Sequence, residues 1–184
     1  MTRKRPSRLQ HIAGIGVDRM GAIADMSGKD FLRLENLDVD IPPDPEAVER
    51  TRKAAAHDDD NSYLPFIGQA HLRDVAARHV SDLSGVPYSG ARNCVISAGG
   101  LSGILNALLA TIEVSDEVIV TDPTYAGLIN RVRLAGSVPK FVPFTFTPGG
   151  EWRLDRDALR AAIGPKVPAT GIWSPACASP AICC

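Results

Sequence analysis

Apolar and polar residues follow two different periods along the chain, and the alternation between them predicts its secondary structure. The interior of the run EVIVT at 117–121 is almost wholly apolar, which is typical of a strand buried on both faces of a parallel sheet. It is one of four short runs that predict strands, at residues 94–96, 117–121, 137–146 and 169–173. Three stretches with helical spacing lie between them: residues 101–111, 126–135 and 154–163. This alternation predicts an α/β fold with a mostly parallel sheet and flanking helices.

The first half of the chain is patterned less regularly. Residues 1–30 show no sustained period and predict an arm with a single helical turn. Residues 31–41 alternate and then meet three prolines, which predicts a short strand or extended segment. Asp44 is placed to cap a helix over 45–57. A stripe of apolar residues after Gly68 predicts a further helix with one buried face.

Prolines and glycines refine this picture. Pro139 and Pro143 place the strand at 137–146 near an edge of the sheet, because proline cannot donate to a ladder. Asp155 is placed to cap the helix at 154–163. His71 and His79 lie on a predicted helix without a neighbouring nucleophile, so we interpret both as packing or surface residues.

Composition and charge exclude several classes of protein. The chain has 184 residues, a net charge of −1 and 45% hydrophobic residues, as expected for one soluble globular domain that binds no nucleic acid. No run approaches the roughly 18 apolar residues of a membrane span, and the N-terminus offers no convincing signal peptide, so we expect a cytoplasmic protein. Three of the four cysteines crowd into the last eight residues without the spacing of a zinc site. The polar loop at 57–63 contains three adjacent aspartates, for which a solvated turn is favoured over a metal site.

Residues 93–125 contain the most informative chemistry. Gly99 and Gly100 follow a predicted strand and open a helix, an arrangement that exposes unpaired N–H groups at the positive end of the helix dipole. These glycines either cradle a phosphate or only shape a tight turn. Neither G-x-G-x-x-G nor the P-loop pattern is present, so a dinucleotide or P-loop nucleotide is poorly supported.

Tyr125 adds a second feature. It leaves the next strand at the carboxyl edge of the predicted sheet, where ligands bind in parallel α/β proteins. A planar side chain there can stack on a flat ring whose phosphate is held by the glycine turn. Phosphate together with a flat ring describes pyridoxal 5′-phosphate.

Several motifs, in the same order and spacing, resemble the class I/II aminotransferases, which are fold type I pyridoxal phosphate enzymes. They are DIPPDPEAV, SYLPFIGQAHLRDVAARH, CVISAGGLSGI, DEVIVTDPTYAGL and LDRDALRAAIGPK. The resemblance covers about residues 30–173 and implies part of the family's large domain, with an N-terminal arm and a small-domain helix. It divides the chain into an arm and extended segment at 1–45, an incomplete α/β domain at 46–173 and an aberrant tail at 174–184.

The resemblance also implies roles for particular residues. The amides of Gly100 and Leu101 would hold the cofactor phosphate, and Tyr125 would stack on the pyridine ring. Tyr63 matches a tyrosine that reaches the neighbouring subunit's phosphate in the family's homodimers, although it is equally compatible with a plain loop aromatic. Arg73 matches a structural position, whereas residues 36–37 replace a glycine-containing substrate loop.

The chemistry of the family depends on later residues. Its relatives move an amino group from an amino acid to a 2-oxo acid with a Schiff-base lysine, a ring-binding aspartate and a carboxylate-binding arginine, all beyond the matched region. None of the four lysines here, Lys29, Lys53, Lys140 and Lys166, occupies a matching motif. We therefore expect no catalytic residue and weak or absent cofactor binding, in a truncated chain whose last dozen residues follow an altered reading frame. The alternative is a non-catalytic fragment that pairs with an intact aminotransferase subunit, and otherwise aggregates.

Overall fold

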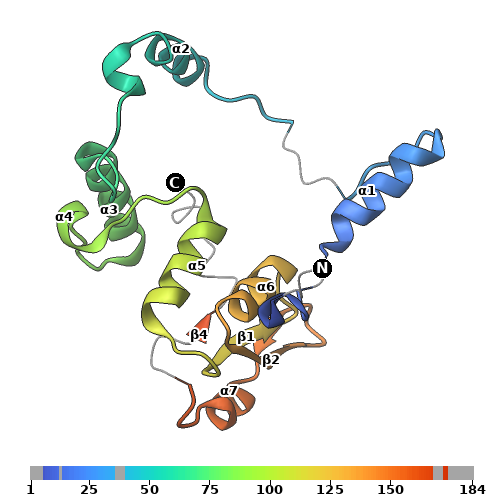
Figure 1. Cartoon of the computed structure of the whole chain (residues 1–184). Coiled ribbons are helices and arrows are strands. Elements are labelled where there is room, and N and C mark those ends of the chain that lie inside the picture. Colours follow the sequence, from blue (N-terminus) through green and yellow to red (C-terminus); the bar gives the residue numbers. More distant parts are fainter. Residues whose placement is uncertain (1–5, 13, 36–39, 168–171, 174–184) are drawn as a thin grey trace, which may run out of the picture. The chain divides into compact units, whose positions relative to one another are not determined.

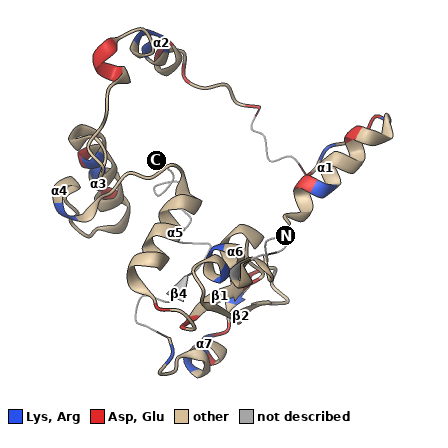
Figure 2. Ribbon diagram, in the orientation of Figure 1, with Lys and Arg blue, Asp and Glu red and all other residues tan. Residues whose placement is uncertain are grey.

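The computed structural model describes residues 6–12, 14–35, 40–167 and 172–173, whose helices and strands are drawn in Figure 1 and whose charged residues are coloured in Figure 2. The chain divides into two units. One unit comprises Met1–Ala13 with Ala70–Cys184, and the other comprises Gly14–Gln69. The predicted strand at 169–173 and the predicted tail at 174–184 lie largely outside the described residues. No described helix is long and apolar enough to cross a membrane.

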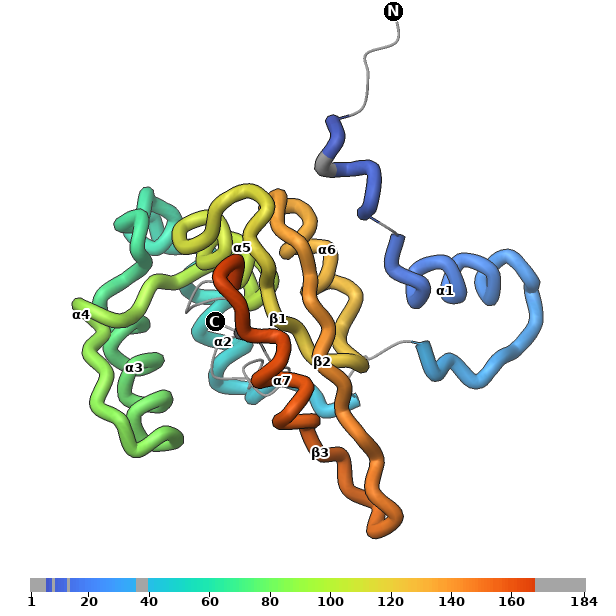
Figure 3. Tube along the Cα trace, turned by 90° about the horizontal axis from the view of Figure 1, so that it is seen from below, coloured from blue at the N-terminus to red at the C-terminus, as the bar shows by residue number. Residues whose placement is uncertain are grey.

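A four-stranded sheet forms the centre of the first unit, in the order β3-β2-β1-β4. β1 (Glu117–Asp122) pairs in parallel with β2 (Val138–Phe146) and with β4 (Ile172–Trp173). β3 (Trp152–Leu154) pairs antiparallel with the end of β2, and the two form a hairpin that is visible in Figure 3. The prediction of a mostly parallel α/β sheet is confirmed.

Helices cover both faces of β1. On one face, Val118 and Val120 pack with residues of α5 (Gly100–Thr111) and α6 (Ala126–Leu134), and Leu108 lies fully buried in this cluster. On the other face, Ile119 packs with Val142 and with Ala162 of α7 (Arg156–Ala162). The interior of β1 is therefore buried on both sides, as its apolar sequence predicts.

Two contacts join the loops that follow α5 and α6. The Ser115 amide donates to the Gly136 carbonyl at 3.0 Å, and the Ser137 hydroxyl donates to the Glu113 carbonyl at 3.2 Å. Since β1 begins directly after the first of these loops, the carboxyl ends of both helices lie at the amino edge of the sheet. Their amino ends consequently lie at the carboxyl edge of β1.

The strands differ from prediction in two places. Residues 94–96 form extended chain outside the four-stranded sheet, so the predicted strand there is wrong. A short β-rich run becomes a strand only when a neighbouring strand pairs with it. β3 was not predicted, because its three residues directly follow a glycine turn, and Leu154 lies in this strand rather than in the predicted helix.

The prolines of β2 face away from β1. Val138 donates its amide to the Asp116 carbonyl at 2.8 Å, so alternate residues of β2, including Pro139 and Pro143, direct their nitrogen outward. β3 pairs only with residues from Phe144 onward. The prolines thus lie where β2 has no outer partner among the described strands, which agrees with the predicted edge position.

α3 (Ala70–Ser84) forms as predicted, but its apolar stripe is not buried. Ala77 is the one buried residue of the helix, whereas Leu72 and Val75 are 40% and 45% exposed. α3 packs chiefly against α4 (Gly90–Asn93), which is too short to cover the stripe. Arg73 donates to the Gly90 carbonyl at 2.8 Å, in keeping with a structural role, and both histidines of α3 are exposed.

The second unit contains α1 (Gly16–Ser27), α2 (Pro45–Ala54) and the 3₁₀ helix η2 (Asp58–Asn61). α1 has twelve residues, so the single predicted turn is too short. Arg33 lies against Gly21 of this helix and pairs with Asp25 and Glu35, which ties the following segment to α1. Of the segment at 31–41 that predicts a strand or extended chain, residues 31–35 and 40–41 are described and form no strand. The predicted Asp44 cap is confirmed, because its carboxylate accepts from the amides of Glu46 and Ala47 at 2.8 and 3.2 Å.

Removal of the cap of α7 should destabilise the first unit. Asp155 accepts from the amides of Asp157 and Ala158 at 3.0 and 2.8 Å, so Asp155→Ala should lower the free energy of unfolding by about 1 kcal/mol. Asp157→Ala is the matched control, because its ion pair with Arg160 is solvent-exposed and contributes little. Urea-dependent pulse proteolysis gives both values, and equal midpoints for the two variants would contradict the assignment.

Candidate functional site

The glycine turn before α5 has a backbone that favours glycine. Gly99 adopts φ +84°, and a Cβ built there would meet nothing within 4 Å, so the conformation rather than crowding selects glycine. The Ser97 hydroxyl donates to the Gly99 carbonyl at 3.1 Å and lies against Gly103, where a Cβ would come within 2.8 Å of it. Gly103 is thus required for the close approach of Ser97 to the helix, a feature that the sequence pattern did not reveal.

The amino end of α5 is open to a ligand. Gly99 is its N-cap residue, and no side chain of the described residues caps the first amides of the helix. Gly100 and Leu101 are the first two helical residues and are both half-buried. A helix start with unsatisfied N–H groups and the positive end of the dipole favours an anion.

Tyr125 lies at the same edge of the sheet. It is the N-cap residue of α6, and α6 packs beside α5. Because both helices begin at the carboxyl edge of β1, the structure brings Tyr125 to the side of the sheet where α5 begins. Its ring folds over Gly127, where a Cβ would lie 2.3 Å from Cε1, and half of the residue is exposed. The ring is therefore positioned by a glycine and is accessible to a flat partner.

Two buried hydroxyl groups lie at this end of β1. Thr121 Oγ1 and Thr124 Oγ1 are both buried and have no hydrogen-bond partner among the described residues. Thr124 directly precedes Tyr125 in the loop after β1. Buried polar groups are normally paired, so an unpaired hydroxyl next to Tyr125 is consistent with a polar ligand. Their lack of a hydrogen-bond partner within the described chain could not be inferred from sequence, since a threonine hydroxyl normally finds a partner in the folded chain.

Tyr63 belongs to the other unit. It follows η2, is fully exposed, and lies close in sequence to Phe66, which is exposed to the same degree. Its predicted role at a phosphate remains a prediction. Residues 36–37, which replace the glycine-containing substrate loop, lie outside the described residues.

Other predicted features are placed away from this edge. Lys140 forms an ion pair with Glu117 at 2.9 Å, on the strands β2 and β1. Among the described residues no group of three or more His, Cys, Asp or Glu side chains could hold a metal ion. The cavities lined by His11 and Arg133 lie near the carboxyl end of α6, at the opposite edge of the sheet.

Resolved pKa shifts occur in the second unit, on α2 and beside α1. A hydrogen bond from Arg52 lowers the pKa of Glu49, and backbone hydrogen bonding with a further bond from Arg33 lowers the pKa of Glu35. A carboxyl group with a lowered folded pKa adds stability above its unfolded pKa, and this is lost as the pH falls through the folded value. Both carboxylates are half-buried and pair with neighbouring arginines, so their shifts report on local pairing rather than on a catalytic site.

Arg52→Gln should raise the pKa of Glu49 toward its ordinary value. The substitution removes the 2.9 Å bond from Arg52 Nε and leaves only the more distant Lys53 at 3.6 Å. Carboxyl ¹³C NMR of a glutamate-labelled chain measures this titration. Arg50→Gln is the control, because Arg50 pairs with Glu46 instead. An unchanged Glu49 titration in Arg52→Gln would contradict the pairing.

The comparisons with known proteins identify the family. The family model for aminotransferase class I and II matches residues 30–181. The chain is 31% identical, over 92% of its length, to a probable N-succinyldiaminopimelate aminotransferase of Mycobacterium tuberculosis, and 27% identical, over 90%, to a histidinol-phosphate aminotransferase of Methanocella arvoryzae. It spans 42% of the length of each of these relatives.

Solved structures show the same fold. The N-succinyldiaminopimelate aminotransferase from Mycobacterium tuberculosis superposes with a TM-score of 0.75 and 29% identity, covering 89% of this chain and 42% of that one. The aspartate aminotransferase from Thermus thermophilus with maleate gives a TM-score of 0.79 at 24% identity, over 90% and 43% of the two chains. The helix-flanked, mostly parallel sheet is thus part of the fold type I architecture. The chain belongs to the class I and II aminotransferases, a family that generally depends on pyridoxal phosphate.

Proposed function

We propose that residues 99–125 form the phosphate and ring site for pyridoxal phosphate, and that the chain represents an N-terminal portion of an enzyme that moves amino groups from an amino acid to a 2-oxo acid. The observation that supports this most directly is that the uncapped start of α5 and the exposed ring of Tyr125 lie at one edge of β1. Family membership supplies the chemical class of the ligand.

Each residue at this edge has a distinct part in the proposal. The amides of Gly100 and Leu101 donate to the phosphate, and the dipole of α5 stabilises its charge. Tyr125 covers one face of the ring, and the hydroxyl of Thr124, which has no hydrogen-bond partner in the described part of the chain, is available to a polar group of the ligand. When bound, pyridoxal phosphate supplies an electron-withdrawing ring that stabilises negative charge at the substrate.

This chain alone is proposed to lack appreciable transaminase activity. The family's lysine, ring-binding aspartate and carboxylate-binding arginine lie beyond the matched motifs, and the described Lys140 is already paired with Glu117. Borohydride reduction with added pyridoxal phosphate, followed by peptide mass mapping, tests this. Stoichiometric labelling of one particular lysine would contradict it, whereas scattered low labelling is expected.

Pyridoxamine phosphate provides a direct test of the binding site, because its amine cannot react with lysine. We expect weak but saturable binding, measured by its fluorescence anisotropy, and still weaker binding in Gly127→Ala, where the new Cβ must displace the Tyr125 ring. Gly149→Ala is the matched control, since a Cβ there meets nothing within 4 Å. Binding that is equal in all three proteins would argue against stacking by Tyr125, and no binding by the native chain would refute the site.

A second candidate function is a non-catalytic fragment that pairs with an intact aminotransferase subunit. The specific observation in its favour is the apolar segment around Tyr63 and Phe66, whose side chains are fully exposed. Co-purification with an intact homologue tests this, with Tyr63→Ser/Phe66→Ser as the variant. Pairing that the double substitution abolishes would support this function, whereas a chain that stays monomeric beside the homologue would exclude it.

A further inference from the structure

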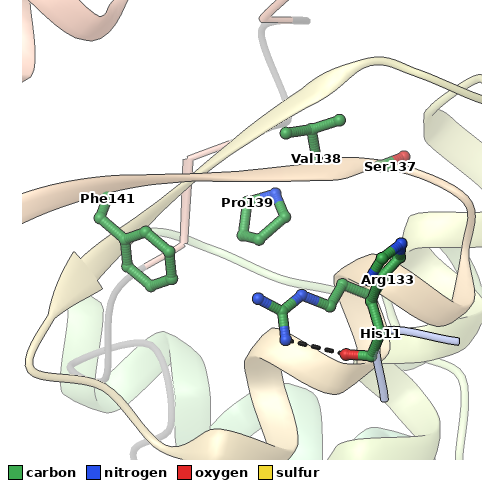
Figure 4. A pocket seen from close by; sticks show the side chains of 6 residues that line it. All are labelled: His11, Arg133, Ser137, Val138, Pro139 and Phe141. Atoms are coloured by element: carbon green, nitrogen blue, oxygen red, sulfur yellow. Dashed lines mark hydrogen bonds between the residues drawn. The ribbon is translucent and has the colours of Figure 1, made fainter. Parts of the chain in front are cut away.

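A second hollow lies at the amino edge of the sheet, opposite the edge that holds the glycine turn (Figure 4). It comprises two adjoining cavities of about 420 and 650 Å³, which share His11, Arg133, Ser137 and Val138 in their walls. Pockets for small molecules usually measure about 300 to 1,000 Å³. The hollow therefore has the size of a ligand site, and neither the glycine turn nor Tyr125 takes part in it.

The charge of the hollow comes from Arg133. No Asp or Glu lines either cavity, and Arg133 has no ion-pair partner among the described residues. Its Nη1 donates to the His11 carbonyl at 3.0 Å, a bond that fixes the guanidinium against the segment at 6–12 (Figure 4). The remaining N–H groups of this guanidinium can donate to a bidentate acceptor such as a carboxylate.

An apolar wall stands beside this cation. Pro139 and Phe141 pair in register with Val118 and Val120 of β1, so they share the face of the sheet that α6 covers. Figure 4 shows the rings of Phe141 and Pro139 projecting from β2 on the side of the strand where the Arg133 guanidinium lies. Phe141 is 44% exposed, which leaves its ring available for contact with a flat ligand.

We propose that this hollow is a second ligand site, which binds a small carboxylate with a flat apolar body. Arg133 pairs with the carboxylate, and Phe141 and Pro139 contact the apolar body. The Ser137 hydroxyl already donates to the Glu113 carbonyl, so Ser137 lines the cavity but is not assigned a hydrogen bond to the ligand. The inference rests on different residues from the proposed cofactor site and does not depend on it.

Phenylacetate and 2-phenylethanol are matched probes, since they share the apolar body and differ in the carboxylate. Ligand-observed saturation-transfer NMR on the full chain at low protein concentration should show saturable binding of phenylacetate, with 2-phenylethanol at least about tenfold weaker, as expected for loss of a charge-assisted pair. Equal binding of the two probes, or no saturable binding of phenylacetate, would overturn the proposal.

Variants then assign the site. Arg133→Gln should weaken phenylacetate binding about tenfold, whereas Arg131→Gln, on the same helix but outside the cavity walls, should leave it unchanged. Phe141→Leu should weaken it about threefold, and this side chain is exposed enough for the substitution to preserve the fold. Unchanged binding in both Arg133→Gln and Phe141→Leu would overturn the assignment. A dimer in sedimentation experiments that Arg133→Gln dissociates would also overturn the proposal, because a second copy of the chain would then occupy the hollow.

Discussion

Leu108→Ala is expected to destabilise the first unit by about 2–5 kcal/mol, the range for truncation of a fully buried leucine. Leu108 is 0% exposed and packs among Val118, Val120, Leu128 and Val132. These residues join α5 and α6 to β1, so the cavity would open in the core that holds both helices against the strand. Pulse proteolysis in urea, which requires little protein, measures the change in the unfolding midpoint.

Leu109→Ala is the matched control for this prediction. Leu109 is the next residue of the same helix and is 60% exposed, so its truncation should change stability by no more than about 0.5 kcal/mol. Both substitutions replace leucine by alanine and alter helix propensity equally. A midpoint for Leu108→Ala equal to that of Leu109→Ala would show that the α5–β1–α6 core does not form as described.

The fold could be predicted from sequence wherever residues a few positions apart determine the outcome. β1 is apolar throughout its interior, Asp44 and Asp155 precede their helices as caps, and Pro139 and Pro143 point to an edge. Elements that depend on distant partners were predicted less well. Residues 94–96 have strand-forming side chains but no place in the described sheet, and α3 has an apolar stripe that α4 does not cover.

The residues of the candidate site also fall into those that local sequence patterns predict and those that depend on distant contacts. Gly99, Gly100 and Tyr125 are recognisable because a glycine turn before a helix and an aromatic after a strand are local patterns. The functions of Gly103 and Gly127 depend on contacts with Ser97 and with the Tyr125 ring, which only the folded chain reveals. The Thr124 hydroxyl, buried with no partner among the residues that the structure describes, is likewise visible only in the folded chain. The same holds for the Arg133 hollow, which depends on a bond between His11 and Arg133, residues far apart in sequence.

Gly100→Pro is expected to weaken pyridoxamine phosphate binding about tenfold, because it deletes one N–H donor to a charged oxygen. Gly100 is the first residue of α5, a position where proline is well tolerated because its amide has no partner within the helix. The substitution therefore removes the proposed phosphate donor while preserving the start of the helix. Fluorescence anisotropy of the bound ligand gives the dissociation constant of each variant.

Gly100→Ala separates loss of the amide from loss of the glycine. Alanine retains the N–H group and favours the helix, so Gly100→Ala should bind within about threefold of the native chain if the backbone donor is what matters. Equal weakening by proline and alanine would mean that the small size of Gly100, not its amide, admits the ligand. Full binding by Gly100→Pro would instead place the phosphate away from this amide, since a charged oxygen cannot lose a donor at the helix start without loss of affinity.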